Sequence, residues 1–264
     1  MIYKRAVAKL RAQDWSAIVI ELGIVILGVY IGTWVANRNQ EQVERDNTIR
    51  LLNQFKPEIQ YQAQQNERLK TYMAITGDYA RVALAGWKGD PNVSDNNFVI
   101  AAYEASQATG SAINTQSWAS IFGSSQVQNI RDPLLRTRLI RVLSLDSAVT
   151  DYRQTQTDYR KNVRQVLPDD VQDAIRARCD DVYPADGISI PYLSPKCNLV
   201  LPPAQARAAA AALRARPSLV NDLYWHRAAV ASMLYNFAGY VRTLQALADA
   251  IDHSGDDQGK AAAQ

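Results

Sequence analysis

Histidine and cysteine are scarce in this sequence, with two of each among 264 residues. The histidines, His226 and His253, and the cysteines, Cys179 and Cys197, do not stand at the short spacings typical of a zinc site. There is also no glycine-rich phosphate loop, and the serine pair in FGSSQ lacks the G-x-S-x-G pattern of a nucleophile elbow. These absences argue against an enzyme, and we expect no catalytic residue, no metal and no cofactor.

An excess of one sign of charge is missing as well. The chain holds 29 Lys and Arg residues against 26 Asp and Glu residues, a formal net charge of +3. Beyond residue 37 the balance is 25 basic to 24 acidic residues. Phosphate backbones are bound by clustered basic residues, so the near-neutral main part of the chain predicts no nucleic-acid partner.

Strand patterns are scarce, whereas helical periodicity is frequent. Apolar residues recur at spacings of three and four over residues 38–88, 133–167 and 218–251. We therefore predict an all-α protein, with one N-terminal transmembrane helix followed by a bundle of three long helices plus short ones. The last of these helices has the heptad-like spacing of a coiled coil. Pro57 should kink the first, because proline removes a backbone hydrogen bond.

One apolar run is long enough to cross a membrane. Residues 15–36 include Glu21 as their only charge. As a helix these 22 residues cover about 33 Å, against roughly 30 Å for a bilayer core. We interpret residues 15–37 as an uncleaved signal anchor. A cleaved signal peptide is the alternative, although cleavage after Ala36 would need a small residue at Trp34.

The flanks of this run predict its orientation. Four Lys or Arg residues stand within the first 14 positions, and basic residues next to a span remain in the cytoplasm. We expect residues 1–14 to form a cytoplasmic basic tip on the bacterial inner membrane. Residues 38–252 would then form a periplasmic helical bundle, and the low-complexity residues 253–264 a flexible tail.

The two cysteines fit an oxidising compartment. Cys179 and Cys197 enclose a segment that contains Pro184, Pro191 and Pro195. In the periplasm we expect a disulfide here, worth about 3 kcal/mol in the chain-entropy model. Two unpaired buried thiols are the alternative.

Glu21 shares a helix face with two glycines, Gly28 and Gly32. Steps of 7 and 11 residues place all three within about 40° of one another around a helix. The G-x-x-x-G spacing allows close helix packing, so this face predicts docking on other transmembrane helices. Three roles for Glu21 stay open: it lies near enough to the interface to reach water or stay protonated, it pairs with a partner helix, or it relays protons as in a stator subunit.

Polar residues interrupt the apolar stripes of the predicted bundle. Asn66, Asp146 and Gln156 occupy stripe positions and form a possible ligand seam between the long helices. His226 lies beside aromatic residues on a predicted helix, which favours a structural histidine over a catalytic one.

An acidic loop offers one weak candidate for calcium. Asp180, Asp181 and Asp186 precede Gly187, but they lack the regular ligand spacing and terminal Glu of known calcium loops. A solvated acidic loop is the interpretation we prefer.

The stretches IELGIVILGVYIG and ANRNQEQVERDNTIRLLNQFKPEI resemble a family of uncharacterised bacterial single-span (bitopic) membrane proteins. Its members have an E-L-x-I-V-x-L-G-V-x-I-G-like anchor, an Asn-rich exit and a long charged helix. The later stretch SWASIFGSSQVQNIRDPLLRTRLIRVL is similar to that family's second block. The resemblance covers about half of the chain and implies a single-span topology with a helical extracytoplasmic domain, but no activity.

Together these features predict a non-enzymatic accessory or scaffold subunit. Its partners would be the lipid bilayer and the transmembrane helices of a larger inner-membrane complex or of a second copy. The alternatives are a periplasmic sensor or ligand-binding bundle that uses the polar seam, and a proton-coupled stator-like subunit that uses Glu21.

Overall fold

The computed structural model describes residues 15–110, 118, 122, 124–130, 132–144, 157–187 and 189–262. Over these residues the chain is all-helical, with one isolated bridge between Val182 and Tyr192 and no strand. This confirms the predicted class. The helices are α2 (Trp15–Trp87), α3 (Asp95–Glu104), α5 (Ser124–Gln128), α6 (Pro133–Leu143), α7 (Asp158–Val166), α8 (Asp169–Cys179), α9 (Pro203–Arg214) and α10 (Ser218–Ala262).

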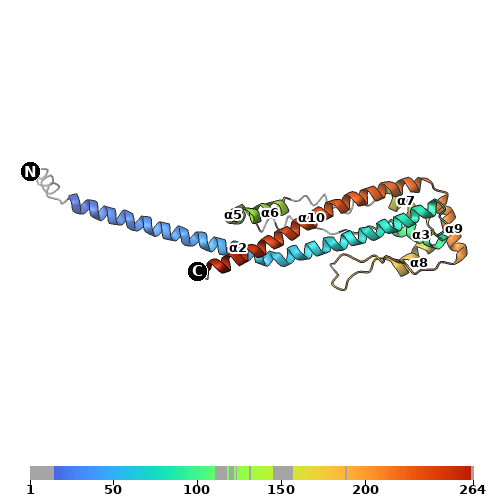
Figure 1. The fold of residues 1–264 in the computed structure, drawn as a ribbon, viewed down its shortest axis with the longest axis horizontal. Helices are drawn as coiled ribbons and strands as arrows, with labels where there is room; N and C mark the ends of the chain where they lie inside the picture. Colours follow the sequence, from blue (N-terminus) through green and yellow to red (C-terminus); the bar gives the residue numbers. More distant parts are fainter. Residues whose placement is uncertain are drawn as a thin grey trace, which may run out of the picture.

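The first helix, α2, determines the elongated shape of the molecule. It runs without a break for 73 residues, or about 110 Å, from the apolar N-terminal run to the far end of the bundle. Pro57 lies inside it, and Figure 1 shows the helix axis changing direction between its blue and cyan parts. Among the described residues it is the one helix long and apolar enough to cross a membrane.

A glycine ends α2 and turns the chain back. Gly89 has a positive φ of 75°, which a residue without a Cβ adopts without strain. The amide of Gly89 donates to the carbonyl of Gly86 at 3.2 Å, and the amide of Asp90 donates to that of Ala85 at 3.0 Å. This Schellman pattern satisfies the last carbonyls of the helix. Ser94 then caps α3 by accepting a hydrogen bond from the amide of Asn97.

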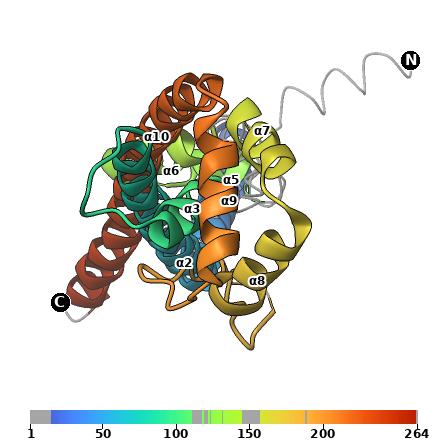
Figure 2. The same cartoon turned by 90° about the vertical axis from the view of Figure 1, so that its right-hand side faces the viewer.

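The last helix, α10, packs along α2 in the opposite direction (Figure 1). Two apolar clusters hold this pair together. The cluster nearer the N-terminal run is formed by α2, α6 and α10 with Trp118 and Phe122, and the distal cluster adds α3, α7, α8 and α9. Figure 2, viewed from the distal end, shows these shorter helices gathered around the ends of the long pair.

Two described helices, α6 and α7, lie within residues 133–167, the range of the middle one of the three predicted long helices. Helix α6 ends at Leu143, where the amide of Ser144 donates to Ile140, and α7 begins only at Asp158. Asp132 caps α6 by accepting from the amide of Leu134 at 2.8 Å. Residues 145–156, which connect the two helices, lie outside the described residues.

The last described helix extends into the C-terminal residues. Helix α10 continues to Ala262, and flexibility of residues 253–264 stays a prediction of the sequence. Extending an existing helix costs much less than starting one, which allows even glycine-containing sequence to prolong it.

Gly86 of α2 lies directly against Phe98 of α3, and replacing it with alanine should destabilise the bundle. A Cβ at this position would lie 2.9 Å from the Cβ of Phe98, whose ring packs edge-on against Trp87. Overpacking of this kind costs about 1–3 kcal/mol, which thermal unfolding followed by circular dichroism should detect. The matched control is Gly77→Ala, also in α2, where a Cβ meets nothing within 4 Å. This variant should be neutral or stabilised by up to about 1 kcal/mol. Equal melting of the two variants would contradict the prediction.

Candidate functional sites

The face predicted for docking lies on the uncovered N-terminal part of α2. Glu21 is exposed, and a Cβ added at Gly28 or Gly32 would meet nothing within 4 Å. The large apolar side chains from Val19 to Val35 are 52–68% exposed, so no other described part of this chain covers them. The three predicted residues thus share an open helix face that has no partner within the described chain.

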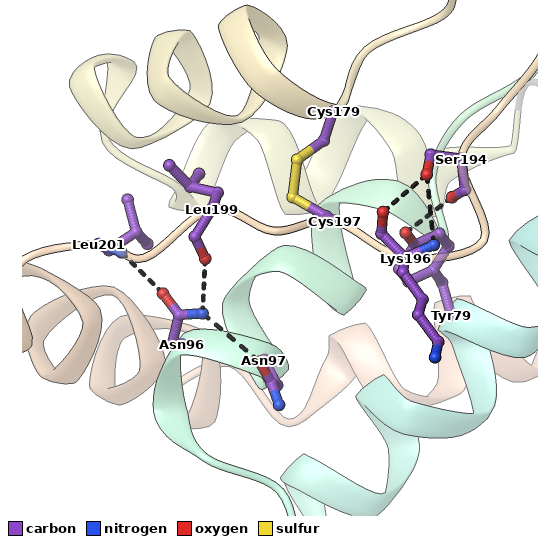
Figure 3. The surroundings of a disulfide bond; sticks show 9 residues. All are labelled: Tyr79, Asn96, Asn97, Cys179, Ser194, Lys196, Cys197, Leu199 and Leu201. Atoms are coloured by element: carbon purple, nitrogen blue, oxygen red, sulfur yellow. Dashed lines mark hydrogen bonds between the residues drawn. A yellow bond between two sulfur atoms is a disulfide. The ribbon is translucent and has the colours of Figure 1, made fainter.

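Cys179 and Cys197 are joined, as the sequence predicts (Figure 3). Their Cα atoms are 5.3 Å apart, at the end of α8 and in the loop before α9. The same loop is held by side chains of other helices. The hydroxyl of Tyr79 donates a hydrogen bond to the carbonyl of Ser194 at 2.8 Å. The side-chain amide of Asn96 donates to the carbonyl of Leu199 and accepts from the amide of Leu201.

The predicted ligand seam is represented by one residue only, because Asp146 and Gln156 lie outside the described residues. Asn66 is fully buried in α2, and its amide nitrogen donates to the carbonyl of Gln62 at 2.7 Å. This bond is local to the helix, whereas the buried Oδ1 of Asn66 has no hydrogen-bond partner among the described residues. The ligand seam stays a prediction.

A buried polar cluster at the distal end was not anticipated. Glu104, the last residue of α3, is 0% exposed, and neither of its carboxylate oxygens lies in a well-formed hydrogen bond with a described residue. Burial raises its pKa from 4.5 to about 8, and the charges of Asp180 and Asp181 add to this effect. Gln107 and the positive charge of Arg164 lower the pKa of Glu104 and so oppose this effect. Glu104 is therefore a group that holds a proton at neutral pH.

Helix α7 contributes two arginines to this cluster. Arg164 donates to Oε1 of Gln107 at 2.9 Å, and its guanidinium lies 4.6 Å from the centre of the Tyr103 ring. Arg160 donates to the carbonyl of Ser106 at 2.6 Å. Such a network fixes the end of α3 against α7.

The acidic loop after α8 also takes part in this cluster. The hydroxyl of Tyr72 donates to Oδ1 of Asp181 at 2.7 Å, and Gln107 donates to Asp180 at 3.3 Å. Burial raises the pKa of Asp181 above its ordinary value, while the bond from Tyr72 opposes the change. Asp186 instead accepts from the backbone of Ser189 at 3.0 Å. The three aspartates therefore have separate structural roles, and no group of three or more potential metal ligands occurs among the described residues.

His226 has the buried position expected of a structural histidine. It is 1% exposed, and its Nδ1 lies 2.9 Å from the hydroxyl oxygen of Thr157. Burial lowers its pKa to about 4, and the Ala105 backbone offsets part of this effect. The ring is therefore neutral at physiological pH. Its Nε2 makes no hydrogen bond within the described chain.

No family model, curated protein or solved structure matches this chain. Its sites are therefore interpreted from its own residues and geometry.

The signal for the Glu104 cluster was present in the sequence but weak. Glu104 follows FVIAAY, a run with apolar residues on every side of the helix, and all seven residues from Phe98 to Glu104 are buried. A helix that is apolar all round is a buried helix. A carboxylate at its end was thus a candidate for burial, although its neighbours come from distant segments.

Proposed function

We propose that this protein is a non-enzymatic, single-span inner-membrane scaffold or accessory subunit. Its anchor helix would dock on the transmembrane helices of a larger complex or of a second copy. The observation that supports this proposal is the open face of α2, on which Glu21, Gly28 and Gly32 lie together. A carboxylate is costly in a bilayer, and small residues at this spacing let a partner helix approach closely.

The connection between anchor and bundle also supports a scaffold. Helix α2 passes from the apolar run into the bundle without a loop, and its first buried residue after the run is Thr48. A continuous helix transmits the position of the anchor to the bundle. It would hold the periplasmic part at a fixed height and orientation above a partner complex.

The proposed orientation places the bundle in the periplasm. Basic residues before the anchor favour a cytoplasmic N-terminus, and the Cys179–Cys197 bond fits an oxidising compartment. The proton-coupled stator alternative would require Glu21 to titrate during function, whereas docking requires only that it pairs with a group on the partner.

Loss of the anchor face should release the protein from its complex. The native protein is extracted in a mild detergent and sized, and co-migrating proteins are identified by mass spectrometry. We expect Glu21→Leu and Gly28→Ile to reduce recovery of the stoichiometric partner, or of the homo-oligomer, by at least about tenfold. The control is Gly23→Ile, because Gly23 is likewise open to a Cβ but lies on another side of the helix. If wild type and all variants migrate as the same isolated species, the anchor is a simple tether and the proposal fails.

A further inference from the structure

An apolar hollow lies between the two long helices in the distal half of the bundle. Its volume is about 260 Å³, close to the lower limit of roughly 300 Å³ for ligand sites in proteins. Its wall is made by Met73, Gly77 and Ala80 of α2 and by Val230, Ala231 and Leu234 of α10.

Small residues keep this hollow open. A Cβ at Gly77 would meet nothing within 4 Å, so the glycine is not required by close packing. Glycine inside a helix is less stable than alanine by about 1 kcal/mol. Its presence at this position therefore leaves space at a cost in helix stability.

His226 also lines the hollow and is 1% exposed. Because burial lowers its pKa to about 4, the ring is neutral at physiological pH and adds no charge to the apolar wall.

Cationic side chains surround one end of the hollow. Arg81 and Arg227 line both this hollow and an adjoining one of about 630 Å³, to which Lys88 also contributes. Arg81 pairs with Asp78, whereas Arg227 makes no ion pair with a described residue. The acidic residues are Asp78, which lines the first hollow and pairs with Arg81, and Asp90, which lines the second. The combined site is thus apolar at one end and cationic at the other.

We propose that this site binds a single-chain amphiphile with an anionic head group, of the long-chain fatty acid type. The tail would occupy the apolar hollow, and the carboxylate would lie beside Arg227 and Lys88. Gly77 follows the end of the apolar run by 41 residues of continuous helix, roughly 60 Å. The amphiphile therefore reaches the site from solution and not from the bilayer that holds the anchor. This binding is independent of docking through the anchor face.

Photo-crosslinking tests the site on the full chain in phosphatidylcholine nanodiscs. The probe is a palmitic acid analogue with a diazirine in its tail, and labelled peptides are located by mass spectrometry. We expect labelling of peptides from residues 73–91 and 226–234. Gly77→Leu should reduce this labelling by at least about tenfold, because the new side chain fills the hollow. Gly239→Leu adds the same side chain to α10 outside the hollow, where a Cβ also meets nothing, and should leave labelling unchanged.

A second variant tests the head group and does not depend on filling the hollow. Arg227→Gln should weaken labelling by the acid while leaving labelling by its methyl ester unchanged. Three results would overturn the proposal: labelling confined to residues 19–35, equal labelling of the wild type and Gly77→Leu, or equal labelling by the acid and the ester in the wild type. Circular dichroism of each variant establishes that it is folded.

Discussion

Replacing Glu104 with glutamine is expected to stabilise the protein at alkaline pH by roughly 3–5 kcal/mol. The pKa of Glu104 is raised from 4.5 to about 8 in the folded protein, and each pKa unit corresponds to about 1.4 kcal/mol. The cause is the buried position of the carboxyl group, to which the negative charges of Asp180 and Asp181 add. Glutamine has nearly the same shape but cannot ionise. Measuring the free energy of unfolding from pH 5 to pH 9 checks this prediction.

The sign of the pH dependence follows from proton linkage. Because the pKa of Glu104 is higher in the folded protein, the folded state retains a proton that the unfolded chain has released between pH 4.5 and about 8. Wild-type stability should therefore fall as pH rises through this window, and the loss is complete above pH 8. The glutamine variant should lack this contribution and show a correspondingly flatter profile.

Glu67→Gln is the matched control for this prediction. Glu67 lies on α2, and its side chain is 45% exposed in an ion pair with Lys70. Exposed pairs of this kind contribute little, so the change in stability should stay within about 0.5 kcal/mol at every pH. A profile for Glu104→Gln that is parallel to the wild type would show that Glu104 is already ionised and compensated in the folded protein.

Removing the Cys179–Cys197 disulfide should lower the free energy of unfolding by about 3 kcal/mol, given its sequence separation of 18. The bond joins the end of α8 to the loop before α9. Without it, the unfolded chain gains conformational freedom that the folded state does not share. Denaturant unfolding of the double variant Cys179→Ala/Cys197→Ala measures the loss, with alanine leaving no polar group at the buried Cys179 position.

Reduction provides the control for this second prediction. A reductant should destabilise the wild type by a similar amount and should not affect the double alanine variant. If reduction leaves wild-type stability unchanged, then the hydrogen bonds of Tyr79 and Asn96 to this loop hold it in place by themselves.

Several elements of this protein were predictable because their signals are local. An apolar run of 22 residues with a single charge, a heptad-like stripe and a proline-rich loop between two cysteines can each be recognised within one segment. They correspond to the apolar part of α2, to α10 and to the disulfide. The glycine that ends α2 is equally local, because a positive φ at Gly89 favours glycine whatever packs nearby.

Other features were decided by segments that are distant in the sequence. Periodicity over residues 133–167 shows an inward-facing stripe, but only the structure shows what it faces: α6 packs against α10 in one apolar cluster, and α7 packs against α10, α3 and α9 in the other. The polar seam was predicted from stripe positions, yet the one described member, Asn66, bonds its own helix. A stripe shows which residues face inward, but not what they face.

The sequence by itself determined the helical class, the apolar run and the cysteine pair, because each depends on neighbours along the chain. Only the tertiary structure decided the environment of Glu104, to which Asp181 and Arg164 come from two distant segments. It alone also brought Gly77, Val230 and His226 into the wall of one hollow. Burial and electrostatic fields depend on distances in space, which local patterns do not encode.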